Sequence, residues 1–170
     1  RIIFLLLIFL FTLSGWAKPF DVIHYQISMD WTSVFNTDLP IYSGSNQVQV
    51  LITTEGTHQI TFNNRKLIID SVRYNHQSVS ILQNVAAEEV TFTFPVSFHL
   101  NDLVEFTIYY RHQTGNEDGF YFYSTNRDDV LHPIAYTMSE PFDARAWVPC
   151  YDSPEDKATL DMLVTVPPSY

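Results

Sequence analysis

The chain is organised around residues 137–167, which read TMSEPFDARAWVPCYDSPEDKATLDMLVTVP. This short, irregular stretch contains Cys150, the only cysteine of the chain, together with a tryptophan, several prolines and several acidic residues. Its end is different, because every second residue from Leu160 to Val166 is apolar, which is the period of a β-strand. We therefore expect an irregular polar and aromatic segment that leads into a strand.

The sequence before this stretch alternates between apolar and polar residues, as half-buried strands do. In Asp21–Asp30 we expect Ile23, Tyr25, Ile27 and Met29 on one face and the polar residues between them on the other. The same period predicts further strands at Val48–Ile52, Ile60–Phe62, Val79–Ile81, Val90–Phe94, Val104–Tyr110, Phe120–Tyr123 and Leu131–Thr137. Clusters of Gly, Asn and Ser separate the runs, and these residues favour turns.

The strand spacing predicts an all-β domain over residues 18–170, as an antiparallel β-sandwich or a curved double sheet. A parallel α/β fold is disfavoured, since no long segment with a helical period could form its crossover helices. Two local signals are more specific. The sequence Asn116–Gly119 predicts a tight turn. Ser153–Asp156 predicts a short helical start, with serine as the cap, proline at the first position and acidic residues in the first turn.

The first residues indicate export. Residues 2–13 read IIFLLLIFLFTL, an apolar run too short for the ~30 Å hydrocarbon layer of a membrane. The small residues Gly15 and Ala17 follow, so the pattern predicts a signal peptide over residues 1–17 that forms a helix and is cleaved after Ala17. An uncleaved anchor and a buried strand are the alternatives. We expect a periplasmic, secreted or cell-surface protein without a stable transmembrane anchor.

Composition excludes some functions. The formal net charge of −10 and the scattered basic residues make the chain a poor nucleic-acid binder. A single cysteine cannot form an internal disulfide, and its neighbours Pro149 and Tyr151 predict that Cys150 is buried.

The chain alone shows no catalytic machinery. None of the six histidines has a second histidine four residues further on, the spacing of a helical zinc site. No glycine-rich phosphate loop and no G-x-S-x-G sequence occurs. A metal site assembled from distant strands remains open, and so does the alternative that the histidines are unrelated.

The residues around Cys150 nevertheless form a recognisable series of motifs. They are Thr137-Met138-Ser139-Glu140-Pro141, Asp143-Ala144-Arg145, Trp147-Val148-Pro149-Cys150-Tyr151-Asp152, Pro154, Lys157-Ala158-Thr159 and Val166-Pro167, with weaker matches at Asp21–Tyr25 and Gly119-Phe120-Tyr121. The series resembles the N-terminal β domain of the aminopeptidase N family, the gluzincin zinc metallo-aminopeptidases that remove N-terminal residues from peptides. The resemblance spans Asp21 to Tyr170.

This resemblance implies a substrate contact at two positions. In the family, the glutamate of the first motif helps to hold the free α-amino group of the substrate, and the matching residue is Glu140. Many members carry glutamine where this chain has Met138, so either the amine is held by fewer groups or Met138 lines the pocket for the first side chain. From the residues alone, Glu140 could instead cap a turn or pair with Arg145. We expect Arg145 to pair with Asp143, Asp152 or another acid, and Trp147 and Tyr151 to pack on the sheet.

The resemblance also implies what the segment lacks. The family's H-E-x-x-H zinc signature and its G-A-M-E-N motif belong to a following domain and do not occur here. The zinc cofactor and the catalytic residues are therefore expected outside this segment, which alone should be inactive. Its expected partners are peptide substrates and a downstream catalytic domain. The alternatives are a non-catalytic β-sandwich binding module and an adhesion or carbohydrate-binding sandwich with an exposed aromatic platform.

Overall fold

The structure is a computed structural model that describes residues 18–113, 119–127 and 130–170. The expected signal peptide and most of the expected turn at Asn116–Gly119 lie outside these residues. The elements are β1 (Phe20–Asp30), α1 (Thr32–Thr37), β2 (Tyr42–Ile52), β3 (Thr57–Asn63), β4 (Ile68–Tyr74), β5 (Gln77–Ser78), β6 (Ser80–Asn84), β7 (Glu89–Phe98), β8 (Leu103–His112), β9 (Phe120–Arg127), β10 (Val130–Thr137) and β11 (Thr159–Thr165). Single 3-10 turns occur at Val85–Ala87 and Ala144–Ala146.

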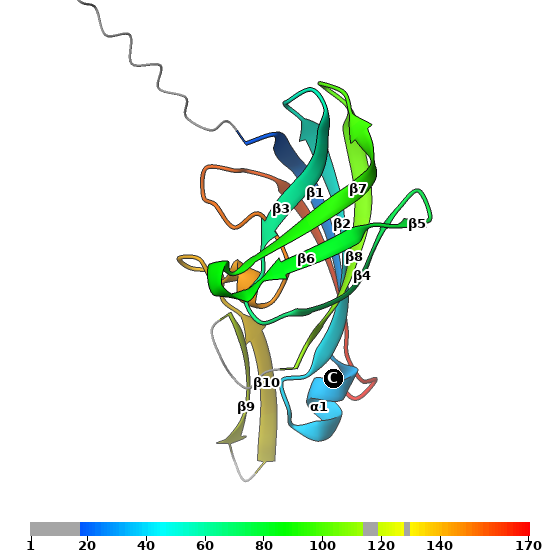
Figure 1. Cartoon of the computed structure of the whole chain (residues 1–170). Helices are drawn as coiled ribbons and strands as arrows, with labels where there is room; N and C mark the ends of the chain where they lie inside the picture. Colours follow the sequence, from blue (N-terminus) through cyan, green and yellow to red (C-terminus); the bar gives the residue numbers. More distant parts are fainter. Residues whose placement is uncertain (1–17, 114–118, 128–129) are drawn as a thin grey trace, which may run out of the picture.

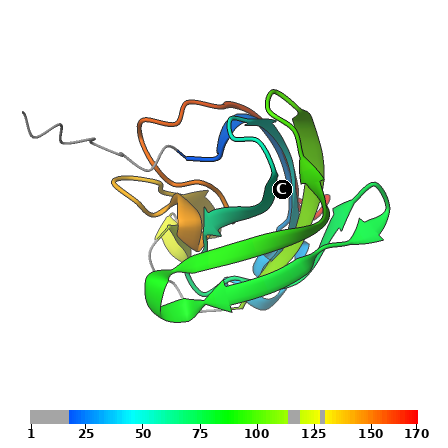
Figure 2. The same ribbon diagram turned by 45° about the horizontal axis from the view of Figure 1, so that its top comes forward.

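The strands form three sheets, as the all-β prediction requires. A six-stranded sheet has the order β11-β1-β2-β8-β4-β5, a three-stranded sheet has the order β3-β7-β6, and β9 pairs with β10 as a separate hairpin. The three-stranded sheet lies across the upper part of the six-stranded sheet as a second layer (Figures 1 and 2). Pairing is antiparallel except between β1 and β11, which run parallel. A parallel pair needs a long connection, and the chain between these two strands provides one.

The main core fills the space between the two layers. It is built from the inward residues of β2, β3, β7 and β8, and aromatic rings dominate it. Phe62, Phe92 and Phe106 are almost fully buried, and their ring centroids lie 5.8–6.0 Å apart. At this spacing tilted and edge-on rings add to the free energy of apolar burial. The core therefore holds the two sheets in one fixed relation.

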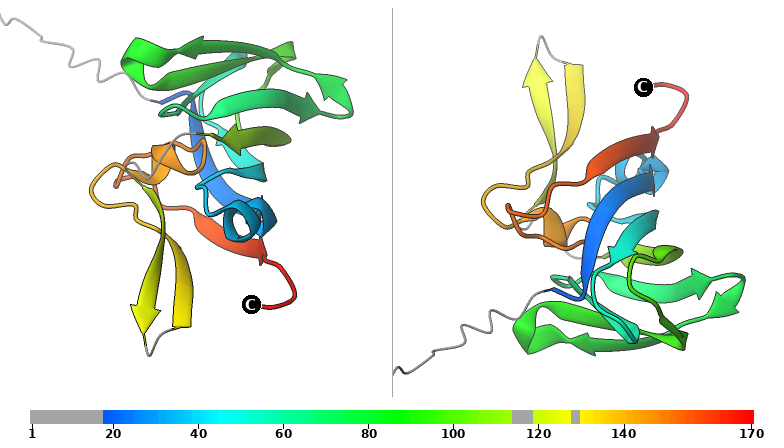
Figure 3. Two further views of the ribbon diagram at one scale, coloured as in Figure 1. Left: turned by 90° about the horizontal axis from the view of Figure 1, so that it is seen from below. Right: turned by 90° about the horizontal axis from the view of Figure 1, so that it is seen from above.

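A second core lies under the lower half of the six-stranded sheet. Here α1, the hairpin β9–β10 and residues 144–150 pack against β1, β2 and β8. Phe120 is completely buried, and its ring is 4.7 Å from that of Tyr42 and 5.2 Å from that of Trp31. Only the base of the hairpin is anchored in this way. Its far end projects from the body on the same side as the C-terminal residue (Figure 3).

Two local predictions were wrong. Ile23 is 38% exposed and Val22 is buried in its place, because a β-bulge between Val22 and His24 shifts the side-chain alternation by one residue. Ser153–Asp156 forms only a turn, closed by the amide of Asp156 and the carbonyl of Ser153 at 3.0 Å, and not the start of a helix. Within the described ranges, no helix is both long enough and apolar enough to span a membrane.

Candidate functional site

The loop that follows β10 carries both predicted contact residues, Met138 and Glu140. The amide of Met138 donates to the carbonyl of Gly119 at 2.8 Å, which ties the start of the loop to β9. Ser139 ties down its middle, because its hydroxyl accepts from Nε1 of Trp147 at 3.2 Å and its carbonyl accepts from the amide of Asp143 at 3.1 Å. The peptide bond that follows Glu140 is cis. The loop is thus held at several points by backbone and side-chain groups.

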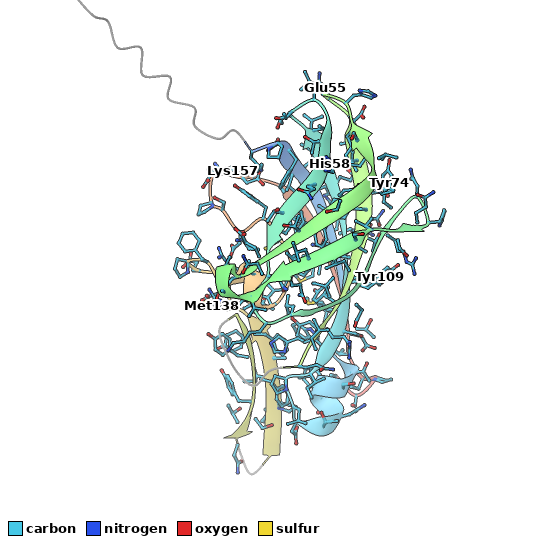
Figure 4. The ribbon with its side chains drawn as sticks, in the orientation of Figure 1. Glu55, His58, Tyr74, Tyr109, Met138 and Lys157 are labelled. Atoms are coloured by element: carbon cyan, nitrogen blue, oxygen red, sulfur yellow. The ribbon has the colours of Figure 1, made fainter. Side chains whose placement is uncertain are left out.

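The side chains that this loop presents are exposed. Met138 is 50% exposed and Phe142 is 46% exposed, and Glu140 between them is exposed too. Figure 4 shows Met138 near the base of the hairpin. Among the described residues, the carboxylate of Glu140 has no hydrogen-bond or ion-pair partner. The alternative pairing with Arg145 is not formed, because Arg145 is directed at Asp152.

Two arginines form ion pairs that hold the segment behind the loop in place. Nε of Arg145 lies 2.9 Å from Oδ2 of Asp152, one of the partners that we expected, and its NH1 lies 3.5 Å from Glu88. Asp143 pairs instead with Arg65 at 2.7 Å, and Arg65 also contacts Glu88 at 2.7 Å. The hydrogen bond from Arg65 and the charges of both arginines hold the pKa of Glu88 below its usual value. The network connects the loop between β3 and β4 to residues 143–152.

The Trp147–Cys150 motif is fixed from the other side by β2 and β3. The hydroxyl of Tyr42 donates to the carbonyl of Trp147 at 2.6 Å, and the side-chain amide of Asn46 donates to the carbonyl of Pro149 at 2.9 Å. Cys150 is buried, as expected, and burial raises the pKa of its thiol. A protonated, inaccessible thiol is not a nucleophile. These residues therefore have a structural role.

The packing predicted for the two aromatic motif residues is confirmed. Trp147 is 5% exposed and belongs to the second core. Tyr151 packs on the first core, with its ring edge-on to that of Phe20 at a centroid distance of 5.7 Å.

A depression of about 340 Å³ lies beside the loop. It is mostly apolar and opens between the motif segment and the strands β1 and β11. Its lining includes Tyr25, Ile27, Ser139, Pro141, Trp147, Tyr151 and Leu160. Ser139 and Pro141 are the two neighbours of Glu140 in the chain, so the exposed carboxylate borders an apolar hollow.

Sequence reasoning missed a tyrosine-rich surface on the hairpin. The rings of Tyr121 and Tyr136 stack with centroids 5.0 Å apart, and Tyr123 meets Tyr136 edge-on at 6.0 Å. Tyr123 is 44% exposed, and Ile134 and Tyr136 are each 38% exposed. These residues alternate along β9 and β10, so the sequence shows that they share a face. It does not show that no second sheet covers this face of the hairpin and that the tyrosines are therefore exposed.

The sequence left open a metal site in which histidines from distant strands come together. Within the part of the chain that the structure describes, no group of three or more His, Cys, Asp or Glu side chains could hold a metal ion.

One of the comparisons with known proteins identifies the family. A model of the Peptidase M1 N-terminal domain matches residues 22–170. Among solved structures, a mutant M1 zinc metallopeptidase from Deinococcus radiodurans, bound to a Tyr-Ser-Ala substrate, matches with a TM-score of 0.67. The match covers 88% of this chain at 24% identity, which shows a shared fold, but it spans only 33% of that protein's chain. No match was found among curated proteins. From the family match over residues 22–170, we conclude that the chain belongs to the Peptidase M1 N-terminal domain family.

Proposed function

We propose that this chain is the N-terminal domain of an exported zinc metallo-aminopeptidase, in which Glu140 binds the free α-amino group of peptide substrates. The observation that carries the proposal is the exposed, unpaired carboxylate of Glu140 on a loop that is braced at several points. Family membership supports the peptidase class. Under this proposal the domain forms one wall of the cleft and performs no bond cleavage itself.

The physical reason for such a contact is the charge of the substrate's N-terminus. A hydrogen bond between an ammonium and a carboxylate is charge-assisted and contributes about 1.5–3 kcal/mol. That corresponds to about ten- to a hundredfold preference for a free amine over a blocked one. Because the loop is held by Gly119, Trp147 and Asp143, the backbone that carries Glu140 loses little conformational freedom on binding.

Met138 is proposed to line the pocket for the first side chain of the substrate. A thioether cannot donate a hydrogen bond and accepts only weakly, so it is a poor partner for an ammonium group. Its flexible, polarisable side chain instead suits an apolar surface that adapts to different side chains. Its exposure of 50% leaves it available for such a contact.

The zinc that membership of the family implies needs at least three ligating side chains. The described residues offer no suitable cluster, and H-E-x-x-H is absent from the sequence. We propose that the zinc ligands lie in a following catalytic domain. The exposed tyrosines of the hairpin and Met138 mark a surface for a protein partner, and this is where we propose that the catalytic domain docks.

The test is a comparison of Glu140→Ala with the unmodified full-length enzyme. We expect kcat/KM for peptides with a free N-terminus to fall about ten- to a hundredfold. Hydrolysis of N-acetylated peptides should stay at its basal level. Glu89→Gln, which removes an exposed carboxylate outside the loop, is the matched control and should leave kcat/KM unchanged. Unchanged kinetics in Glu140→Ala would remove the assignment.

Two further parts of the proposal have separate tests. Export through residues 1–17 requires a mature protein that begins after Ala17, and mass spectrometry that finds residues 2–13 retained would reject it. The alternative of a non-catalytic binding module is distinguished by the coding sequence downstream of Tyr170. An H-E-x-x-H sequence there supports the enzyme, and its absence from the whole reading frame supports the module.

A further inference from the structure

The outer face of the six-stranded sheet carries two hollows that share one aromatic ring. The first, of about 370 Å³, is lined by residues that include Ser28, Asp30, Ser43, Ser45, Asp70 and Arg111. The second, of about 690 Å³, is lined by residues that include Arg73, Asn75, His76, Leu103, Glu105 and Thr107. Tyr109 lines both hollows. In the view of Figure 4 it lies on the opposite side of the molecule from Met138, so this face is separate from the proposed amine-binding loop.

Tyr109 is not part of either hydrophobic core. On β8 its inward neighbours Ile108 and Tyr110 are buried, whereas Tyr109 points outward and is 45% exposed. A polar outer face is ordinary for an antiparallel sheet whose other face covers the core. A half-exposed aromatic ring that belongs to neither core is not explained in this way.

Glu105, in the lining of the second hollow, is already held in place by hydrogen bonds. Gln47 and Gln49 donate to different oxygens of Glu105, the second at 2.9 Å. Each amide keeps its oxygen free to accept, and a carboxylate that accepts two hydrogen bonds has lone pairs left. Groups held in place before a ligand arrives lose little freedom when it binds.

Across the two hollows, the arginines are held in the same manner. Arg111 forms a bidentate contact with Asp70 at 2.6–2.9 Å, and Arg73 donates to the hydroxyl of Ser78 at 2.7 Å. The two hollows together contain two arginines and three carboxylates, in a chain with a net charge of −10. This face is therefore close to neutral and rich in paired donors and acceptors.

We propose that this face, centred on Tyr109, binds a neutral oligosaccharide of several pyranose rings. A pyranose has an apolar C–H face, which suits stacking on an exposed tyrosine, and vicinal hydroxyls, which suit planar amides and carboxylates. The two hollows have volumes within the range of ligand sites and lie on either side of the ring. One sugar would stack on Tyr109 while its neighbours occupy the hollows, so a longer oligosaccharide binds more tightly than a disaccharide.

The experiment is calorimetric titration of the mature full-length protein with cellohexaose, maltohexaose and the matching disaccharides. We expect one of the two hexasaccharides to bind, and its disaccharide to bind more weakly. Tyr109→Ala should lower the affinity about tenfold, and Tyr109→Phe should retain it because the ring is kept. Tyr123→Ala is the matched control, since Tyr123 is equally exposed but lies on the hairpin.

Several outcomes would overturn the proposal. These are no binding of either hexasaccharide by the folded chain, unchanged affinity in Tyr109→Ala, a larger loss in Tyr123→Ala, and tighter binding of a sulfated hexasaccharide than of the neutral ones. Circular dichroism checks that each variant is folded. Glu140→Ala should bind the oligosaccharide normally, so failure here and failure of the proposed peptidase role are independent results.

Discussion

Replacing Arg145 by alanine should lower the free energy of unfolding more than the loss of an exposed surface ion pair does. The Arg145 side chain is 16% exposed and its partner Asp152 is 11% exposed, so solvent screens the pair weakly. The substitution removes a charge-assisted hydrogen bond of 2.9 Å and a second bond of 3.2 Å to the carbonyl of Asp152. It also leaves a mostly buried carboxylate without its cation. Together these losses lower the free energy of unfolding by about 2–4 kcal/mol.

The assay is urea unfolding followed by tryptophan fluorescence, with a thermal melt that should shift down by about 5–15 °C. The matched control is Arg111→Ala. Arg111 and Asp70 form an equally well-aligned pair at 2.6 Å, but their side chains are 43% and 37% exposed. Exposed pairs contribute at most about 1 kcal/mol. If Arg145→Ala lowers the free energy of unfolding no more than Arg111→Ala does, burial does not make the Arg145–Asp152 pair stronger, and the reasoning is refuted.

Three further substitutions test other parts of the scaffold. Gly119→Ala should lower the free energy of unfolding, measured by chemical denaturation, by about 1–2 kcal/mol or more. The reason is that φ of Gly119 is +93° and the new Cβ would lie 2.4 Å from the carbonyl oxygen of Asp143. An unchanged free energy of unfolding would contradict this. Tyr42→Phe leaves the buried carbonyl of Trp147 without its donor and should cost about 1–3 kcal/mol, whereas an unchanged urea midpoint would argue against this bond. The pKa of Glu88 is lowered in the folded chain, so its contribution to stability is present above the usual pKa of glutamate and is lost as the pH falls through the lowered value. Glu88→Gln should therefore lose less stability on acidification than the unmodified chain, and equal losses would reject the linkage.

The strands with strict alternation were predictable, and those with irregularities were not. Val104–Tyr110 behaves as predicted because every second residue is buried along β8. Ile23 was placed on the wrong face because a bulge leaves no trace in a pattern of period two. The strand Ile68–Tyr74 was missed entirely, since only Val72 among its residues is buried and a second bulge interrupts its pairing.

The parallel pairing of β11 with β1 could not be predicted from the sequence either. Alternation indicates that Leu160–Val166 is extended, but it does not specify a partner or a direction. In the structure β11 is an edge strand, and Leu160 and Met162 remain 50% and 46% exposed. The helix Thr32–Thr37 was not expected either, because a six-residue helix with only Val34 buried has no measurable period.

At the candidate site, local contacts were foreseeable and distant ones were not. An ion pair between Arg145 and an acidic residue was expected, and Asp152, one of the candidates, is its partner. Arg65 and Glu88 lie in connections far away in the sequence, between β3 and β4 and just before β7, and no motif indicates that they complete the network. Exposure of Glu140 could not be deduced from residues alone, since its loop could equally have folded back on an arginine.

The most direct test of the account is a crystal structure of the full-length protein with a peptide whose N-terminus is free. The account predicts that a carboxylate oxygen of Glu140 lies about 2.7–2.9 Å from the α-amino nitrogen of the peptide. An amine held only by other groups, with Glu140 directed to solvent or packed against its own domain, would contradict it.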